Sequence, residues 1–495
     1  MTPETLILAA IAVPAIGAML IPVFRSVPNL RETVTIVTAL ALFAIVVSLA
    51  VAVSGGARPA VNLWQVTPAL ALSFRIEPLG MLFACVASTL WIVNSVYSIG
   101  YMRGHDEPRQ TPFYVCFALA LSATMGLAFS SNLFTMFVFY EMLTISTYPL
   151  VAHARTREAM RGARIYLTML IGSSLLLFLP AILITYALAG TLDFTAGGIL
   201  GGKADGMVMG LLLALYAFGI GKAGVMPGHF WLPAAMVAPT PVSALLHAVA
   251  VVKAGVFCVL KVVVYVFGID TLRTSGQSEW LIYVASFTIL AASIVAMMQD
   301  NLKKRLAYST VSQLSYIVLA AAIATKMSIV GGGLQIAMHA MGKITLFFCA
   351  GAIYVIAHKT EVSELTGLGR KMPYTFAAFL VGAMSIIGLP PLGGSWAKWW
   401  IMAGALDAGQ LAVVGVLIVS SLLNVAYLLP IPFKALFLPA PKLASAGAAG
   451  VEMADGLERK YWMVVLPPCL TAFGCLVLFF TVDWFAALLQ PIVSP

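Results

Sequence analysis

Apolar stretches long enough to cross a lipid bilayer recur along this chain from one end to the other. A membrane-spanning helix needs about 20 consecutive, mainly apolar residues, and about fourteen such stretches lie between residues 5 and 490. The 495-residue chain is 61% hydrophobic and 9% charged, whereas soluble domains carry roughly 25% charged residues. We therefore predict an all-α polytopic membrane protein with about 14 transmembrane helices.

The first apolar stretch has the character of a membrane anchor. It contains Pro14 and Pro22, and it lacks both a basic start and a small-residue cleavage site. Because a secretory signal peptide carries both of those features, we expect this segment to be retained rather than removed.

Basic residues are distributed unequally between the two sides of the membrane when the loops are assigned to them alternately. One side collects 18 of them: Arg25, Arg31, Arg103, Arg109, Arg155, Arg157, Arg161, Arg164, Lys303, Lys304, Arg305, Lys359, Arg370, Lys371, Lys434, Lys442, Arg459 and Lys460. The other side collects five: Arg58, Arg75, Lys203, Arg273 and Lys326. Cytoplasmic loops carry an excess of Lys and Arg, so both termini are predicted to lie on the non-cytoplasmic side. The net charge of +9 then reflects topology rather than nucleic-acid binding.

Six charged side chains fall inside the apolar stretches, where lipid should exclude them. They are one acid and five bases: Glu141, Lys222, Lys253, Lys261, Lys343 and Lys398. A charge at the centre of a membrane helix costs about 2.5–3.5 kcal/mol. These groups must therefore face water, one another or polar backbone.

Two of the lysines lie beside Gly- and Pro-rich breaks in their stretches. Lys222 precedes Gly224 and Pro227 in FGIGKAGVMPGHFWLP, and Lys398 follows Pro390 in GLPPLGGSWAKWW. A broken helix beside a charge indicates an ion site near the membrane midplane in transporters. Because the two breaks lie about 175 residues apart, they predict two copies of one structural unit.

Two histidines accompany the lysines. His247 lies six residues before Lys253, so the two share a helix face only if the helix is irregular, which the prolines near its start would favour. His339 and Lys343 are spaced i, i+4, one turn apart on one face. A histidine next to a lysine at membrane depth favours proton transfer over a simple core role, because imidazole titrates near neutral pH.

These residue types predict a proton relay. A desolvated lysine can release and regain a proton near neutral pH, and an acid beside it can hold that proton until the pair separates. Glu141 and Lys222 are the expected pair, with a permanent structural ion pair as the alternative. Lys261 lies nearer to a helix end and is expected to snorkel toward the interface. The predicted relay consists of Glu141, Lys222, His247, Lys253, His339, Lys343 and Lys398.

No cofactor or metal is expected, and the chain is not expected to be an enzyme on its own. The six cysteines form no CxxC motif, which argues against iron–sulfur or zinc ligation. The segment GGILGGKA (197–204) departs from the phosphate-binding loop pattern because Ala204 replaces the hydroxyl residue that would hold magnesium. The chain itself carries no flavin or quinone signature, so any redox chemistry would reside in partner subunits.

Three segments carry a resemblance to a known family: GKAGVMPGHFWLPAAMVAPTP (221–241), PTPVSALLHAVAVVKAGVF (239–257) and DNLKKRLAYSTVSQLSY (300–316). They resemble the proton-translocating membrane subunits of respiratory complex I, the A and D subunits of Mrp-type sodium/proton antiporters, and subunits of membrane-bound hydrogenases. The resemblance covers about residues 75–430. It implies two inverted five-helix repeats, each with a broken helix, and a chain of buried Lys, His and Glu across the membrane midplane.

The resemblance also assigns positions within that fold. Seven residues occupy positions at which the family carries its buried charges: Glu141 in the fifth helix, Lys222 in the broken seventh, His247 and Lys253 in the eighth, His339 and Lys343 in the eleventh, and Lys398 in the twelfth. The implied domains are residues 1–110 (helices 1–3), 111–270 (first repeat, helices 4–8), 271–437 (second repeat, helices 9–13) and 438–495 (a cytoplasmic linker and the last helix). Length and Lys398 make the chain most similar to an Mrp D-type subunit.

Together these features predict a proton-translocating subunit of a multisubunit monovalent cation (sodium)/proton antiporter. It would lie in a bacterial or archaeal cell membrane and work with other membrane subunits. The main alternative is a proton-pumping subunit of a complex I-like NADH:quinone oxidoreductase or a membrane-bound hydrogenase. A scaffold subunit without transport, and coupling to uptake of another solute such as bicarbonate, are further alternatives.

Overall fold

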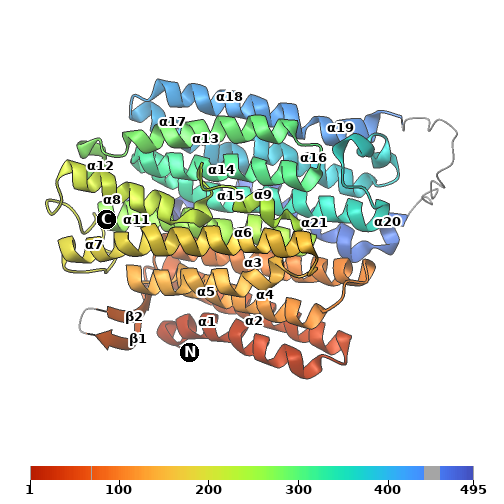
Figure 1. Ribbon diagram of the computed structural model, residues 1–495, viewed down its shortest axis with the longest axis horizontal. Coiled ribbons are helices and arrows are strands. Elements are labelled where there is room, and N and C mark those ends of the chain that lie inside the picture. The colour runs from red at the N-terminus through yellow and green to blue at the C-terminus, as the bar shows by residue number, and fades with distance from the viewer. Residues whose placement is uncertain (1, 68–69, 440–456, 494–495) are drawn as a thin grey trace.

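The computed structural model describes residues 2–67, 70–439 and 457–493, and over these ranges the chain is almost entirely helical (Figure 1). Most helices run along the long axis of the molecule as a single bundle (Figure 1). The prediction of an all-α polytopic membrane protein is confirmed. Lys442 and the part of the predicted cytoplasmic linker at 440–456 lie outside the described residues.

Twelve helical segments of the described chain are long and apolar enough to cross a membrane. Some combine two α-helices or include a 3₁₀ or π turn. They are α1 (Pro3–Leu20) with the 3₁₀ turn Ile21–Phe24, α2 (Pro28–Ser54), α3 (Pro78–Gly104), α4 (Gln110–Ala128), α5 (Leu133–Val151), α6 (Arg157–Ser173) continued by α7 (Leu179–Ala189), α10 (Thr240–Ala244) continued by α11 (Val251–Val262), α13 (Glu279–Met298), α14 (Leu302–Ile323), α15 (Lys326–Ala357), α18 (Leu411–Leu428) continued by α19 (Pro430–Phe437), and α21 (Trp462–Phe480).

Two further passages are broken at the predicted Gly- and Pro-rich sites. The first is α8 (Gly206–Gly219), which gives way to a 3₁₀ turn at Gly221–Ala223 before the short helix α9 (Trp231–Ala234). The second is α16 (Pro373–Ile387) followed by α17 (Gly394–Asp407). Counted with the twelve continuous segments, they give fourteen passages within the described residues, in line with the predicted number of about 14.

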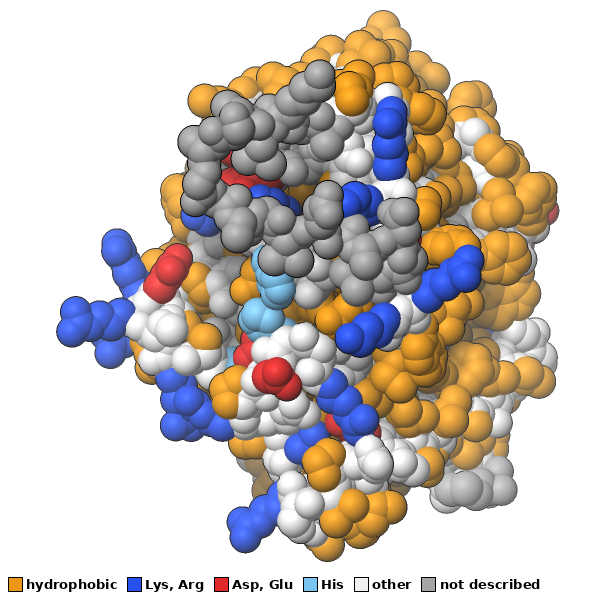
Figure 2. Space-filling view, turned by 90° about the vertical axis from the view of Figure 1, so that its right-hand side faces the viewer, with side chains coloured by type: hydrophobic (Ala, Val, Ile, Leu, Met, Phe, Trp, Pro, Cys, Tyr) orange, Lys and Arg blue, Asp and Glu red, His pale blue; other side chains and the backbone are white. Residues whose placement is uncertain are grey.

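The two ends of the bundle differ in their elements and charge. A hairpin of antiparallel strands β1 (Ala60–Thr67) and β2 (Leu70–Arg75) lies at one end with the short helix α12 (Ile269–Ser275) (Figure 1). The opposite end carries α19 and α20 (Leu457–Lys460), and Lys and Arg side chains are spread over it (Figure 2). We call these the hairpin end and the basic end. Both the first and the last described residues lie toward the hairpin end (Figure 1).

The longest helix, α15, packs against α3, α14, α16, α17 and α21, and it also contacts the short last helix α22 (Val482–Val493). Its glycine run makes the closest of these approaches possible. A Cβ on Gly331 would lie 2.7 Å from the backbone nitrogen of Ile401 on α17, and one on Gly332 would lie 3.1 Å from the Cβ of Ala320 on α14. Small residues let membrane helices approach closely, so this run has a packing role and places α15 among the helices that carry the predicted relay.

Candidate functional site

All six basic members of the predicted relay are enclosed by protein. The exposed fraction is 0% for Lys222, His247, Lys253 and Lys343, 1% for His339 and 7% for Lys398. A buried charge is costly unless hydrogen bonds or an opposite charge compensate it. The contacts of each base therefore determine what the row of bases can do.

Lys222 lies in the 3₁₀ turn at which α8 is broken. Its ammonium donates to the backbone oxygen of Tyr140 at 2.9 Å and to the hydroxyl of Thr144 at 2.6 Å, both on α5. The same nitrogen lies 3.1 Å from the centre of the Tyr140 ring, which adds a cation–π contact. Every group that holds this lysine is uncharged.

The predicted ion pair between Glu141 and Lys222 is not formed in this structure. Neither carboxylate oxygen of Glu141 has a hydrogen-bond partner among the residues described. The neighbouring α5 groups satisfy Lys222 here, which argues against the alternative of a permanent ion pair, while a pair that forms and separates during transport stays a prediction. Glu141 is half-buried, and the adjacent Met142 is 47% exposed on the apolar flank of the bundle.

Lys253 and His339 make the only direct contact between two relay members within the described ranges. Nζ of Lys253 on α11 lies 2.5 Å from Nδ1 of His339 on α15. An ammonium donates to a neutral imidazole nitrogen, and both groups can carry the shared proton. The second ring nitrogen of His339 has no partner in the described chain.

His247 occupies the π-helical turn Leu245–Val249 between α10 and α11. This is the irregularity that the six-residue spacing from Lys253 requires. The ring lies against Phe347 of α15, with centroids 4.8 Å apart, and neither ring nitrogen is hydrogen-bonded to any described residue. π-turns inside helices occur frequently at functional sites.

Lys343 shares α15 with His339 but contacts a different helix. Its ammonium donates to the hydroxyl of Ser309 at 2.7 Å and to the backbone oxygen of Leu306 at 3.3 Å, both on α14. The hydroxyl of Tyr427 on α18 donates to the same Ser309 oxygen at 2.9 Å. One serine oxygen therefore joins the lysine to a polar chain that continues toward α18.

Lys398 follows the second helix break and uses it. Its ammonium donates to the backbone oxygen of Ile387, the last residue of α16, at 2.8 Å and to the hydroxyl of Ser421 on α18 at 3.1 Å. The last carbonyls of a helix lack intrahelical partners, so the break provides an acceptor at this depth. Lys398 also borders a cavity of about 520 Å³ whose wall includes Trp399.

The neutral acceptors are the part of the site that sequence reasoning missed. A buried pair of neutral amides accompanies the hydroxyls named above: Gln335 on α15 donates to Gln313 on α14 at 3.0 Å. Gln335 lies one turn before His339, and that i, i+4 spacing was an available signal. The hydroxyl-rich run YSTVSQLSY of α14 was another.

Lys261 does not snorkel, contrary to the expectation from its position. Its side chain is completely buried, and its ammonium lies 3.2 Å from Oε2 of Glu77, the residue that precedes α3. It also donates to the backbone oxygen of Ser130 at 2.5 Å. A carboxylate 184 positions away in the sequence gives this charge a buried partner, so it has no need to reach the interface.

The arrangement has a simple chemical consequence. Lys222, Lys343 and Lys398 each donate to two oxygen atoms of neutral groups. A neutral amine retains two N–H donors, so the same acceptors can stay bound after a proton leaves. A lysine paired with a carboxylate would instead lose a strong attraction, because opposite charges interact strongly in a low-dielectric interior. The neutral acceptors therefore allow protonation to change with little rearrangement.

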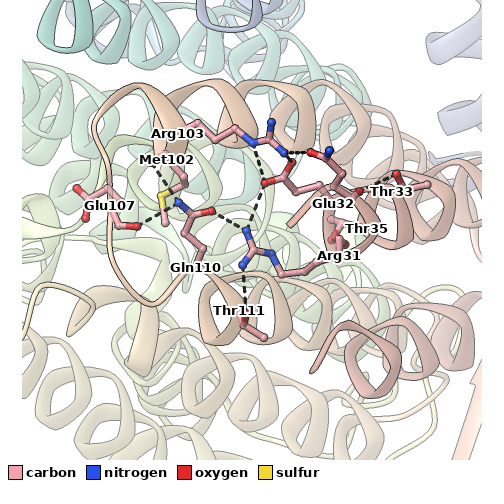
Figure 3. A network of polar contacts seen from close by, with 10 residues as sticks. Arg31, Glu32, Thr33, Thr35, Met102, Arg103, Glu107, Gln110 and Thr111 are labelled. Atoms are coloured by element: carbon pink, nitrogen blue, oxygen red, sulfur yellow. Dashed lines mark hydrogen bonds and ion pairs between the residues drawn. The ribbon is translucent and has the colours of Figure 1, made fainter. Parts of the chain in front are cut away.

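The basic end contains a contrasting polar network (Figure 3). Glu32 on α2 is 4% exposed and accepts from Arg31, at 3.3 Å, and from Arg103 on α3, whose Nε lies 3.2 Å away. Arg31 also donates to Gln110 at 2.7 Å and to Thr111 at 3.2 Å, both on α4. This basic-end cluster joins three helices through charges of both signs.

A polar pocket of about 490 Å³ also lies at the basic end and is lined by Glu107, Lys303, Tyr354 and Thr240. The carboxylate of Glu107 lies 3.7 Å from Nε2 of His153. Burial raises the pKa of Glu107, although neighbouring bases oppose the shift, and burial lowers the pKa of His153. Burial thus shifts the pKa of each group in the direction of its neutral form, and Thr240 places the pocket at the start of the helical segment that carries His247.

Comparison with known proteins gives a family pattern and several relatives. The pattern for "NADH:quinone oxidoreductase/Mrp antiporter, TM" matches residues 130–424. Subunit N of the NADH-quinone oxidoreductase of Desulforudis audaxviator is 33% identical over 364 residues, which covers 73% of this chain and 72% of that protein. Hydrogenase-4 component B of Escherichia coli is 29% identical over 360 residues, covering 69% of this chain and 52% of that protein. The chain thus spans about half the length of that relative, as it does of NAD(P)H-quinone oxidoreductase chain 5 of Synechocystis, of which it covers 51%.

Two solved structures have the same fold as this chain. A chain of the Mrp complex from Dietzia superposes with a TM-score of 0.86 at 23% identity, covering 100% of this chain and 97% of the other. A chain of the archaeal membrane-bound sulfane sulfur reductase superposes with a TM-score of 0.84, also at 23% identity, covering 98% and 97%. The fold is therefore shared with subunits of more than one kind of membrane complex.

Proposed function

We propose, from the premise that this chain belongs to the NADH:quinone oxidoreductase/Mrp antiporter family of transmembrane proteins, that it moves protons within a multisubunit monovalent cation/proton antiporter. The chain is a multi-pass, antiporter-like membrane protein of that family. Sodium as the cation, a D-type position and assembly with other membrane subunits are the finer parts of the proposal. The near-complete mutual coverage with a chain of an Mrp complex supports them.

The observation that carries the proposal is the row of enclosed bases held by uncharged acceptors. Protons enter the Glu107 pocket at the basic end and pass His247 to the Lys253–His339 contact. From there the row extends to Lys222 on one side. On the other side it extends through Lys343 to Lys398 across α14 and α18.

Glu141 acts at the far end of this row. Both of its carboxylate oxygens are buried and have no hydrogen-bond partner among the residues that the structure describes, and the next residue, Met142, is exposed on the apolar flank of the bundle. In the proposed cycle Glu141 pairs with Lys222 only when a proton arrives, and the resting structure represents the unpaired state. The flank itself is the surface that we assign to a neighbouring membrane subunit.

The proposed topology places the basic end in the cytoplasm and both termini on the opposite side. The spread of Lys and Arg over that end (Figure 2) supports this orientation. We also propose the two repeats, 111–270 and 271–437, with flanking regions 1–110 and 438–495. The two broken passages support them, because each lies fourth in its repeat. Equivalent helices are five passages apart and so cross in opposite directions.

The test is sodium-dependent proton flux in inverted membrane vesicles that contain the native assembly. Lys222→Met removes the proton-carrying nitrogen and should lower the flux about a hundredfold, the usual scale for loss of an acid–base group. Lys203→Met is the matched control, because Lys203 lies in an outer loop and donates only to the backbone oxygen of Ala189 among described residues. Unchanged flux in a fully assembled Lys222→Met variant would refute the proposal.

A redox-driven pump is the second candidate, since the named relatives include NADH-quinone oxidoreductase and hydrogenase subunits. The same vesicles distinguish the two. In an antiporter, sodium dissipates an imposed proton gradient without any electron donor. In a redox pump, NADH or another reductant builds the gradient, sodium has no effect, and purification of the native complex recovers iron–sulfur subunits.

A further inference from the structure

A second charged group lies outside the proposed relay, at the hairpin end of the bundle. Five chain segments converge there: the end of β2 at Arg75, the residue before α3 at Glu77, Ser130 after α4, the loop at Phe194, and α11 at Lys261. This is the end opposite the basic end (Figure 1). We call Arg75, Glu77 and Lys261 the hairpin-end cluster.

The cluster connects the enclosed interior with the outer surface through one carboxylate. Glu77 is 6% exposed, and its two oxygens face different partners: Oε2 lies 3.2 Å from the fully buried ammonium of Lys261, and Oε1 lies 3.1 Å from the guanidinium of Arg75. The side chain of Arg75 is 37% exposed. Glu77 therefore separates a base that water cannot reach from a base that water does reach.

Lys261 also continues the helix of the relay. It lies eight residues after Lys253 on α11, which is about 12 Å along a helix axis. The two lysines thus mark successive depths of one helix, the first bound to His339 and the second to Glu77. Between Lys253 and the end of α11 at Val262, Lys261 is the only basic residue.

The basic-end cluster shows how a purely structural ion pair differs from a pair that can transfer a proton. There Glu32 is held by two guanidiniums, and arginine does not release its proton in proteins. At the hairpin end one of the two bases is an ammonium, which can give its proton to the carboxylate. The products are a neutral amine and a carboxylic acid, and in a low-dielectric site the neutral pair avoids the cost of keeping two buried ions.

We propose that Lys261 and Glu77 form a proton port between the relay and the non-cytoplasmic surface. The inference depends on the proposed function. An N–H bond of Lys261 breaks as an O–H bond of Glu77 forms; the acid then releases its proton to outer water, and the amine takes another proton from the side of Lys253. Arg75 stays charged throughout and orients the carboxylate. The other charged and titratable groups around the pair are Cys258 on α11, Tyr265 in the following π turn and, beyond Tyr265, Arg58 before β1.

The decisive variant is Lys261→Arg, assayed in the native assembly in vesicles. It keeps a positive charge opposite Glu77 but cannot release a proton. A port predicts that assembly and thermal stability persist while proton flux falls at least tenfold. A structural ion pair predicts the reverse, with arginine restoring flux that Lys261→Met loses, and that result would overturn the proposal.

A second variant keeps the proposal testable if arginine does not fit the site. Glu77→Gln has nearly the same volume and can still accept from Arg75, but it cannot carry a proton. The proton flux of this variant should fall, and it should no longer saturate as the proton concentration on the hairpin side is raised. Its dependence on the proton concentration on the basic side should be unchanged. An equal change in the dependence on both sides would contradict a port. Arg273→Met, which breaks the exposed ion pair with Asp407 at the same end, should leave flux unaltered. Loss of flux in Lys222→Met together with normal flux in both port variants would refute the port alone.

Discussion

The buried charges of this protein are held in two different ways, and the difference follows their position along the bundle. At the basic end, Glu32 is bound by Arg31 and Arg103, so charge meets charge (Figure 3). In the interior, Lys222 and Lys343 donate hydrogen bonds only to hydroxyl and carbonyl oxygens. Both solutions satisfy buried polar groups, but they differ in what happens when a proton leaves.

An arginine–glutamate network is fixed in its charge state and can serve only to hold helices together. Removing one member leaves the others as uncompensated buried charges, which is strongly destabilising. A lysine bound by neutral dipoles can change protonation without leaving an ion behind. The comparison teaches that the chemistry of the base and its partner, rather than burial, separates the two groups: arginine, which keeps its proton, supports the fold, whereas the charges that we assign to transport are lysines held by neutral dipoles or, at the hairpin end, by a carboxylate that can take the proton.

The largest expected effect comes from breaking the basic-end cluster. Glu32→Gln leaves two guanidiniums around a neutral amide and should destabilise the protein by on the order of 3 kcal/mol, since Arg31 is buried. Thermal unfolding of the purified protein in detergent measures this loss. Sodium-dependent proton flux per assembled complex should stay near its normal value.

Glu364→Gln is the matched control for that experiment. It breaks the ion pair between Lys359 and Glu364, in which the ammonium nitrogen lies 3.1 Å from the carboxylate oxygen. The two side chains are 44% and 38% exposed, respectively. Exposed pairs contribute about 0–1 kcal/mol. Equal destabilisation by the two changes, or a selective loss of flux in Glu32→Gln, would break the distinction between the two kinds of charge.

A smaller effect should follow from removing one neutral acceptor of the relay. Ser309→Ala leaves Lys343 with only the backbone oxygen of Leu306, and it also removes one of the two acceptors of the Tyr427 hydroxyl, the other being Asn424. We expect a loss of about 1 kcal/mol of stability and a several-fold loss of proton flux. Unfolding and vesicle flux should be measured on the same preparations.

Ser315→Ala sharpens this second test. Ser315 is also buried on α14, but its hydroxyl donates to the backbone oxygen of Val311 on its own helix. The Ser315→Ala variant should lose no more stability than Ser309→Ala does, and its proton flux should stay normal. If both serine variants reduce flux equally, the neutral acceptors of the relay have no special role.

The sequence alone was sufficient for the passages and for the positions of the buried bases, because both follow from short local patterns. An apolar stretch needs about 20 residues, and a lysine within it is visible by inspection. The helix breaks at Lys222 and Lys398, and the irregular turn at His247, were likewise predictable from nearby Gly and Pro. These features depend on neighbours in sequence.

The partners of those bases could not be predicted in the same way, because they come from distant segments. Thr144 lies 78 positions from Lys222, and nothing in its local sequence marks it as an acceptor. For this reason the sequence did not predict the neutral α5 groups that hold Lys222 in this structure, nor Glu77 as the partner of Lys261. Only the packing of α5 against the first break and of α3 against α11 decides these contacts.

The smallest predicted effect concerns Glu107, which is intermediate between the two kinds of charge because its neighbours are histidines. Burial raises its pKa above 4.5, so between pH 4.5 and that raised pKa the folded protein holds a proton that the unfolded chain has lost. Its contribution to stability is thus full below pH 4.5 and is lost as the pH rises through the folded pKa. The melting temperature of the native chain minus that of Glu107→Gln should therefore decrease over this range, by on the order of 1 °C. Glu158→Gln is the matched removal of an exposed acid from the same pocket. A melting-temperature difference that grows with rising pH would mean that His105 and His153 hold Glu107 as a carboxylate, as arginines hold Glu32. The pocket would then have a structural role and would not be part of the proton path.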